Sequence, residues 1–292
     1  MDWGLLAAVA GPAALLPLLL PRFRAGLRRS LAPERTTAGG TPADFALPAR
    51  EITLDGSNGK RLFAWYAPAP GATTAIVLLH GWGGNAGHLL PLAAPLYAAG
   101  HAVLLLDARC HGRSDEDDFA SMPRFAEDLE CALAWLRRQP ETADARLATV
   151  GHSVGAAAAL LAAARGDALA AVVSVAAFAH PESIMRRFLA AKRIPFVPLG
   201  WYALRYVERV IGQRFDAIAP ENTIRDVRCP ILLVHGRDDV TVPVDDARRL
   251  AERAAGRARL LLLPGDHERI DAEGDGMATL LAFLAGALRP RA

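Results

Sequence analysis

Ser153 has the sequence surroundings of a catalytic nucleophile. It lies in the segment GHSVG (residues 151–155), after the apolar run Leu147–Val150 and before an alanine-rich stretch. The pattern G-x-S-x-G between a strand and a helix makes a tight turn that exposes the serine hydroxyl, and the two glycines let the backbone approach closely. Such a serine can also cap the following helix. We predict that Ser153 is a nucleophile; a helix cap is the alternative role, and the two roles are compatible.

A serine hydroxyl needs a base to take its proton, and the base needs a carboxylate to orient it. His267 follows the strand-like run Ala258–Leu263, and Asp239 follows the run Ile231–Val234. In parallel sheets, ligand sites lie at the carboxyl ends of the strands. We therefore predict that His267 and Asp239 complete a catalytic set with Ser153.

Other residues compete for these roles. Asp238 is next to Asp239, and only one of two adjacent side chains can face the histidine; the other can bind backbone groups of the turn. Glu182 is a third carboxylate candidate. Seven more histidines exist, and none of them follows the last strand: His80, His88, His101, His111, His152, His180 and His235.

The segment HGWGGN (residues 80–85) follows the apolar run Ala75–Leu79. The carbonyl under attack becomes an oxyanion, which fixed N–H donors stabilise. The residue after the nucleophile, Val154, offers one such N–H, and the first strand-to-helix loop offers another, for which we favour Trp82. A plain glycine turn with Trp82 packed in the core is the alternative.

The rest of the chain alternates strand-like and helix-like stretches, which predicts a mostly parallel sheet with helices on both faces. A hairpin is expected first, from Glu51–Leu54 and Leu62–Ala67. The further strand-like runs are Ala102–Leu106 and Ala170–Val175, and the helix-like segments are Leu89–Ala99, Met122–Arg138, Val154–Arg165, Asp245–Ala255 and Gly276–Leu288.

The alternation breaks between Phe178 and Val227, which predicts a helical insertion over the site. Its apolar residues Phe196, Trp201 and Tyr202 are candidates for binding substrate. Its basic residues favour an anionic substrate, and they are Arg186, Arg187, Lys192, Arg193, Arg205 and Arg209. The insertion could instead be an ordinary pair of helices that seals the sheet.

The N-terminus differs in composition from the rest. Trp3–Leu20 is uncharged and arginines follow it, so we predict a membrane anchor over residues 1–30 that leaves the catalytic domain in the cytoplasm. An amphipathic or buried helix is the alternative. Residues 31–50, rich in Pro, Gly, Thr and Ala, predict a linker, and residues 51–292 the catalytic domain.

Composition excludes several classes of protein. Lys and Arg number 33 against 31 Asp and Glu, a net charge of +2, and this balance gives no support to a nucleic-acid partner. The three cysteines are too few and too scattered for a disulfide framework, and their spacing predicts no metal site.

With these motifs, the chain resembles the serine hydrolases of the α/β-hydrolase fold, which are esterase- or lipase-like and related to serine aminopeptidases. The matching segments are residues 80–85, 107–114, 151–155, 235–243 and 265–267. The resemblance implies an eight-stranded, mostly parallel sheet, a Ser-Asp-His triad, no cofactor, and a cap at about residues 178–227. Cys110 departs from it, since similar proteins usually have glycine there.

The sequence thus predicts a hydrolase that cleaves a carboxylic ester or related acyl bond through an acyl-enzyme. Its expected partner is a small acyl substrate, lipophilic or anionic. A serine aminopeptidase and a thioesterase are alternatives on the same fold. A binding protein without catalytic activity is the alternative from another class.

Overall fold

The computed structural model describes residues 20–36, 40–166, 169–268 and 274–289 of the chain. Its centre is an eight-stranded sheet in the order β1-β2-β4-β3-β5-β6-β7-β8. The strands are β1 (Arg50–Asp55), β2 (Arg61–Ala67), β3 (Thr74–Leu79), β4 (Ala102–Leu106), β5 (Arg146–His152), β6 (Ala171–Val175), β7 (Ile231–Gly236) and β8 (Ala258–Leu263). β2 pairs antiparallel with β1 and β4, and all other pairs are parallel. The eight-stranded, mostly parallel sheet predicted from the sequence is confirmed.

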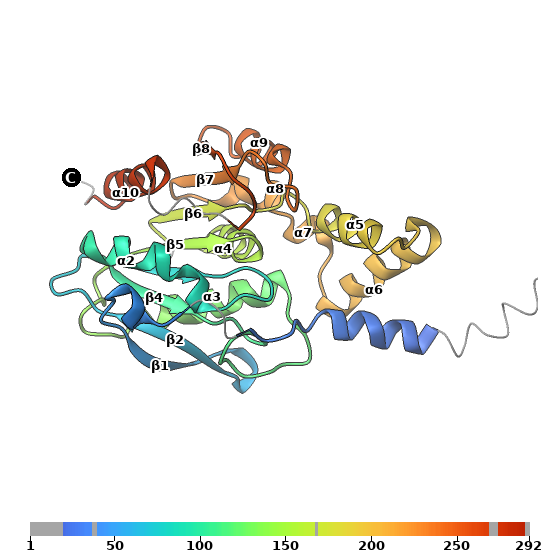
Figure 1. Cartoon of the computed structure of the whole chain (residues 1–292), viewed down its shortest axis with the longest axis horizontal. Coiled ribbons are helices and arrows are strands. Elements are labelled where there is room, and N and C mark those ends of the chain that lie inside the picture. Colours follow the sequence, from blue (N-terminus) through green and yellow to red (C-terminus); the bar gives the residue numbers. More distant parts are fainter. Residues whose placement is uncertain (1–19, 37–39, 167–168, 269–273, 290–292) are drawn as a thin grey trace, which may run out of the picture.

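Helices cover both faces of this sheet (Figure 1). α3 (Met122–Leu136), α4 (Val154–Arg165) and α9 (Val244–Arg253) pack on one face, and α2 (Leu90–Ala98) and α10 (Asp275–Ala287) pack on the other. A hydrophobic core lies on each face of the sheet, and β3 contributes to both. Val77 belongs to the core on the side of α3, α4 and α9, and Ile76 belongs to the core on the side of α2 and α10. Because both faces are covered, the strand is apolar without alternation.

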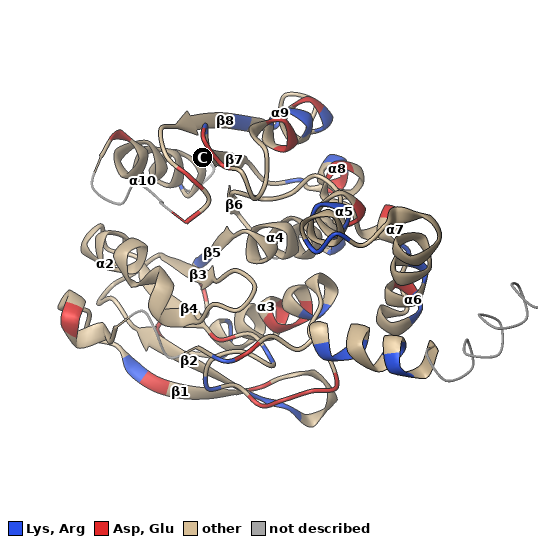
Figure 2. Cartoon of the chain, turned by 45° about the vertical axis from the view of Figure 1, so that its right-hand side comes forward, with Lys and Arg blue, Asp and Glu red and all other residues tan. Residues whose placement is uncertain are grey.

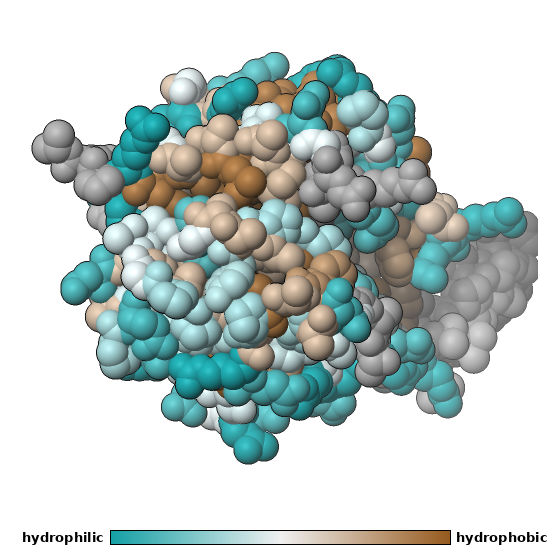
Figure 3. Space-filling view, turned by 60° about the vertical axis from the view of Figure 1, so that its left-hand side comes forward, coloured by the Kyte–Doolittle hydropathy of each residue, from teal (hydrophilic) through white to brown (hydrophobic). Residues whose placement is uncertain are grey.

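Charge and hydropathy follow this layering. The strands β3, β4, β6 and β7 contain no Lys, Arg, Asp or Glu, and the charged residues lie on helices, on loops and on the remaining strands, among them the edge strands β1 and β8 (Figure 2). The side of the molecule that carries α2 and α10 also presents a band of hydrophobic surface bordered by hydrophilic residues (Figure 3).

The sequence placed the regular elements closely. β4, β8 and α4 have the predicted bounds, and the remaining predicted strands and helices differ by one or two residues at their ends. β5 is the main extension, since it continues through Gly151 to His152, into the motif that the sequence interpreted as the turn. Pairing with β6 explains this, because Gly151 and His152 still lie opposite Ser174 and Val175.

The break in the pattern between β6 and β7 is a group of helices. It consists of α5 (Pro181–Ala191), α6 (Trp201–Ile211), α7 (Phe215–Ile218) and α8 (Pro220–Thr223), with a short turn at Phe196–Gly200 between α5 and α6. α5 and α6 project beyond the end of the sheet (Figure 1). α6 buries Ala203, Leu204 and Val207 on one side and exposes Trp201 and Arg209 on another.

The N-terminal residues that the structure describes lie against this helical group. Residues 20–30 form a helix beside α6 (Figures 1 and 2). Arg24 Nε donates to the Tyr202 hydroxyl at 2.5 Å. After the helix, the chain continues along the domain, where the Leu31 carbonyl accepts from Ala120 N at 2.7 Å, and Pro42–Phe45 form a 3-10 turn.

The predicted membrane topology requires correction. In the described ranges, no helix is both long enough and apolar enough to cross a bilayer. This finding contradicts the expected single-pass membrane protein with a cytoplasmic catalytic domain. The run Trp3–Leu20, on which that expectation depended, lies outside the described residues except for Leu20.

Candidate active site

Ser153 occupies the turn between β5 and α4. Its backbone has φ 54° and ψ −117°, a conformation that a residue with a side chain adopts at a cost of about 1–3 kcal/mol. Its neighbours permit the turn because they lack Cβ atoms. A Cβ on Gly151 would lie 2.4 Å from the Gly155 carbonyl oxygen, and one on Gly155 would lie 2.4 Å from that of Leu79. Main chain therefore packs directly on main chain here, and the serine stands out from the sheet.

His267 and Asp239 meet Ser153 at the carboxyl ends of the strands. His267 Nε2 lies 3.0 Å from Ser153 Oγ, and His267 Nδ1 lies 2.7 Å from Asp239 Oδ2. His267 comes from the loop after β8, and Asp239 from the loop after β7. These are hydrogen-bond distances, so the serine can pass its proton to the imidazole while the carboxylate holds the opposite ring nitrogen.

Asp239 is fixed as an ionised carboxylate. Its Oδ1 accepts from the N–H groups of Thr241 at 2.9 Å and Val242 at 2.7 Å. Burial raises the pKa of the Asp239 carboxyl, but hydrogen bonds from His235, His267 and Val242 N–H outweigh burial and hold it well below its usual value. Asp238 is exposed, and its carboxylate accepts from Gly265 N at 3.4 Å. The structure thus brings Asp239, and not Asp238, to the histidine.

His152 also holds the His267 loop. Its Nε2 donates to the His267 carbonyl oxygen at 2.8 Å. Burial lowers the pKa of His152, so the ring is neutral at neutral pH. The sequence did not single out this histidine, since nothing in it showed that the ring would reach the loop after β8.

The two backbone N–H groups predicted to bind the oxyanion belong to the loop after β3 and to the first residue of α4. In the described part of the chain, neither Trp82 N–H nor Val154 N–H donates a hydrogen bond. Val154 begins α4, and the first N–H groups of a helix have no partner within it. A Cβ on Gly81 would lie 3.2 Å from Ser153 Cβ, so the loop that carries Trp82 passes directly beside the serine.

A buried pair of histidines supports this loop. His80 Nε2 accepts from Ala108 N at 3.1 Å, and its Nδ1 donates to the Gly81 carbonyl at 2.7 Å. An imidazole that accepts at one nitrogen must be neutral, and burial accordingly lowers the pKa of His80 to about 4. The His111 ring lies 5.0 Å from that of His80 and 5.7 Å from that of Trp82.

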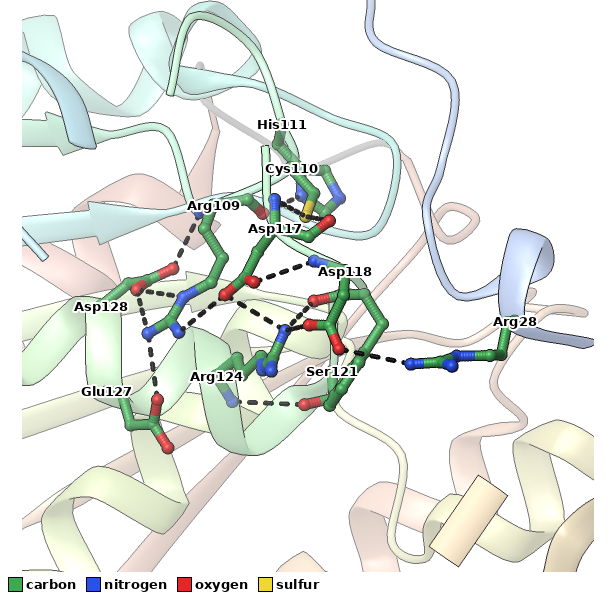
Figure 4. A network of polar contacts seen from close by, with 11 residues as sticks. Arg28, Arg109, Cys110, His111, Asp117, Asp118, Ser121, Arg124, Glu127 and Asp128 are labelled. Atoms are coloured by element: carbon green, nitrogen blue, oxygen red, sulfur yellow. Dashed lines mark hydrogen bonds and ion pairs between the residues drawn. The ribbon is translucent and has the colours of Figure 1, made fainter. Parts of the chain in front are cut away.

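Ion pairs of the buried Arg109 hold the loop after β4, which also carries His111 (Figure 4). The Arg109 side chain is 0% exposed and contacts Asp128 at 2.6 Å, Glu127 at 3.0 Å and Asp117 at 3.6 Å. Three carboxylates around one guanidinium compensate for its burial. Cys110 in the same loop has φ 65°, a left-handed conformation that suits the glycine usual in similar proteins.

A cavity of about 840 Å³ opens over Ser153. Its lining includes the loop of residues 80–84, Ser153 and His267, and also Val240, Thr241 and Glu268. α5 contributes Ile184, Arg187, Phe188 and Ala191. Part of the predicted cap therefore covers the serine.

The apolar cap residues singled out from the sequence lie elsewhere. Phe196, Trp201 and Tyr202 are absent from the lining of this cavity. Phe196 packs against the core and carries Arg186 over its ring. Trp201 is 54% exposed, and Tyr202 contacts the N-terminal helix through Arg24. Residue type suggested these aromatic residues, but only the rotation of α5 and α6 decides which side chains reach the cavity.

The lining also contains residues that sequence reasoning missed. Ile184, Phe188 and Ala191 share one face of α5, and Val240 and Thr241 directly follow Asp239. Helical spacing in α5 was the available signal, but the sequence could not show which face meets the site. In the described ranges, no group of three or more His, Cys, Asp or Glu side chains is arranged to hold a metal ion.

Comparison with known proteins identifies the family of this chain. The sequence model of the family described as serine aminopeptidase, S33, matches residues 71–209. An uncharacterised protein of Mycobacterium tuberculosis is 30% identical over 235 residues, which cover 78% of this chain and 76% of that protein. The chain belongs to the S33 serine aminopeptidase family. It is an α/β-fold hydrolase.

Other similarities extend the picture of this S33-family hydrolase. The uncharacterised protein YfhR of Escherichia coli is 27% identical over 256 residues, covering 83% of both chains. Among solved structures, the esterase Pf2001 of Pyrococcus furiosus superposes with a TM-score of 0.72 at 19% identity, covering 88% of this chain and 100% of the esterase. At that identity the likeness concerns the fold.

Proposed function

We propose that this S33-family hydrolase cleaves carboxylic esters through an acyl-enzyme on Ser153. The observation that carries the proposal is the continuous contact from Ser153 Oγ through His267 to Asp239, with Ser153 and His267 lining an 840 Å³ cavity. Nucleophile, base and orienting carboxylate are then all within hydrogen-bond reach, which serine catalysis requires.

In the first half-reaction Ser153 Oγ attacks the acyl carbon as His267 Nε2 takes the hydroxyl proton. The ester carbonyl becomes an oxyanion, for which the N–H groups of Trp82 and Val154 are the proposed donors. Loss of one such donor typically costs about 3–4 kcal/mol of transition-state stabilisation. The imidazolium then gives its proton to the departing alcohol, and the acyl group remains on Ser153.

In the second half-reaction water takes the place of the alcohol. His267 Nε2 accepts a proton from the attacking water, a second oxyanion forms and collapses, and the proton returns to Ser153 Oγ. The carboxylic acid leaves, and it ionises at neutral pH. Throughout, Asp239 keeps the Nδ1 proton in place and stabilises the imidazolium without itself becoming protonated.

Cleavage of amides by an aminopeptidase is the alternative within the family. It would require carboxylates around the free amine of the substrate. In the described ranges, the cavity has a single carboxylate in its lining, that of Glu268, and it also has the cation of Arg187. The fold likeness to the esterase of Pyrococcus furiosus supports the ester proposal as well.

Labelling with a fluorophosphonate tests the nucleophile. Wild-type protein should be labelled, Ser153→Ala should not, and the matched control Ser183→Ala should be labelled like wild type, since Ser183 lies at the start of α5 and binds the His180 carbonyl. A catalytically silent binding protein would take no label. A panel of acyl esters, acyl thioesters and aminoacyl amides then ranks kcat/KM, and a preference for the amides would overturn the ester proposal.

A further inference from the structure

One face of α5 borders the cavity. The contributing residues Ile184, Arg187, Phe188 and Ala191 follow the spacing i, i+3, i+4, i+7 of a single helix face. Three of these four side chains are apolar and one is a cation. A ligand in the cavity therefore meets a hydrocarbon wall with one positive charge in it.

Arg187 differs from the other basic residues of the cap. In the described ranges it is the only Lys or Arg that lines the cavity. Its neighbour Arg186 pairs with Glu182 at 2.7 Å, and Arg205 pairs with Glu208 at 2.7 Å. Of the basic residues of the cap, Arg187 is thus the one that brings a positive charge to the cavity.

An ion pair with Asp246 holds the Arg187 guanidinium in place. Its Nη2 lies 3.2 Å from Oδ2 of Asp246 in α9, and that carboxylate also accepts from Ala179 N at 3.2 Å. Asp246 is buried, so this contact fixes the cation rather than leaving it free in water. A guanidinium has five N–H donors, and Arg187 Nε, although buried, has no partner in the described part of the chain.

We propose that Arg187 binds a carboxylate of the substrate, so that the natural ester carries a carboxylate at the end of an apolar chain. This inference depends on the ester hydrolysis proposed above. Ile184 and Phe188 would contact the chain, and the planar guanidinium suits a carboxylate because it can form two parallel hydrogen bonds. Glu268 also borders the cavity, but it is exposed and water screens its charge.

The test compares two 4-nitrophenyl esters with the same suberyl chain. In one the far end of the chain is a free carboxylate, and in the other it is a neutral methyl ester. We expect Arg187→Gln to lower kcat/KM for the carboxylate ester by about tenfold or more relative to kcat/KM for the neutral ester, because a charge-assisted hydrogen bond is lost. Arg187→Lys should restore part of the difference. Arg186→Gln is the matched control, one residue away and paired outside the cavity, and it should behave like wild type.

The outcomes separate the two proposals. Equal loss on both esters in Arg187→Gln would overturn this inference and leave ester hydrolysis intact. Failure of the wild type to cleave either ester would overturn the proposed function. In that case, calorimetric titration of suberate into wild type and Arg187→Gln still decides the binding site, and equal affinity would overturn the role of Arg187.

Discussion

Replacement of Asp239 by Asn tests the catalytic geometry in most detail. In the native site one carboxylate oxygen accepts from the N–H groups of Thr241 and Val242, and the other faces His267 Nδ1 at 2.7 Å. An Asn side chain can keep the first set with its carbonyl oxygen. Its amide nitrogen then points at His267 and donates, which forces the imidazole proton onto Nε2.

With its proton on Nε2, His267 faces the serine with a donor and cannot act as the base. We expect kcat for a 4-nitrophenyl ester to fall by about 10⁴-fold, which corresponds to about 5 kcal/mol in the activation barrier. Substrate binding should change little and the variant should still fold, because the backbone contacts of the side chain are retained. Steady-state kinetics and thermal melts of the purified variant give both readouts.

Asp238→Asn is the matched control. Its carboxylate is exposed and binds only the Gly265 N–H at 3.4 Å in the described part of the chain, so kcat should stay within about tenfold of wild type. A larger loss in Asp238→Asn than in Asp239→Asn would refute the assignment of the acid. A 10⁴-fold loss in Asp239→Asn that came with an unfolded protein would refute the reasoning from tautomers.

Three further predictions follow from the packing. Gly155→Ala should lower the free energy of unfolding by about 3 kcal/mol or more, measured in urea, since its Cβ would lie 2.4 Å from a fixed backbone oxygen; a change below 1 kcal/mol would contradict that contact. Because burial lowers the pKa of His80 to about 4 from 6.5, the unfolded chain binds a proton between those values that the folded chain does not. Stability should therefore fall as pH drops through this window, by up to about 3 kcal/mol from this group, and melts of His80→Asn should show a smaller fall; an equal fall would exclude His80 as the cause. Phe188→Ala should shift preference between neighbouring acyl-chain lengths by about 1–3 kcal/mol in kcat/KM, whereas Trp201→Ala, outside the cavity, should not; a shift with Trp201→Ala alone would reverse the assignment.

The sequence was most informative where local geometry constrains residue type. The turn at residues 151–155 needs glycines on both sides of Ser153, and the parallel strands carry apolar residues on both faces, so the sheet and the serine could be predicted. The pairing of His267 with Asp239 could be proposed because both follow strand ends. Even there, the choice of Asp239 over Asp238 depended on which side chain the turn directs inward.

The cap was predicted less well, because the rotation of each helix about its axis determines which side chains face the cavity. Arg186 and Arg187 are adjacent and identical in type, yet the Arg186 guanidinium stacks on the Phe196 ring whereas Arg187 borders the cavity. Nothing in the residue types distinguishes them. The aromatic residue Trp201 looked suited to an apolar substrate, but the packing of α6 turns it toward the exterior.

The contact of Gly151 and Gly155 has a consequence for how far such sequences can diverge. At Gly151 and Gly155, the first turn of α4 meets the ends of β3 and β5 through main-chain atoms. Main-chain atoms do not change with the sequence, so these contacts persist when the identity of nearby side chains changes. Substitutions elsewhere in the core can then accumulate without moving the nucleophile, as long as both positions stay free of Cβ atoms. In line with this, the chain shares the architecture of the esterase Pf2001 of Pyrococcus furiosus at a TM-score of 0.72, although the two sequences are only 19% identical.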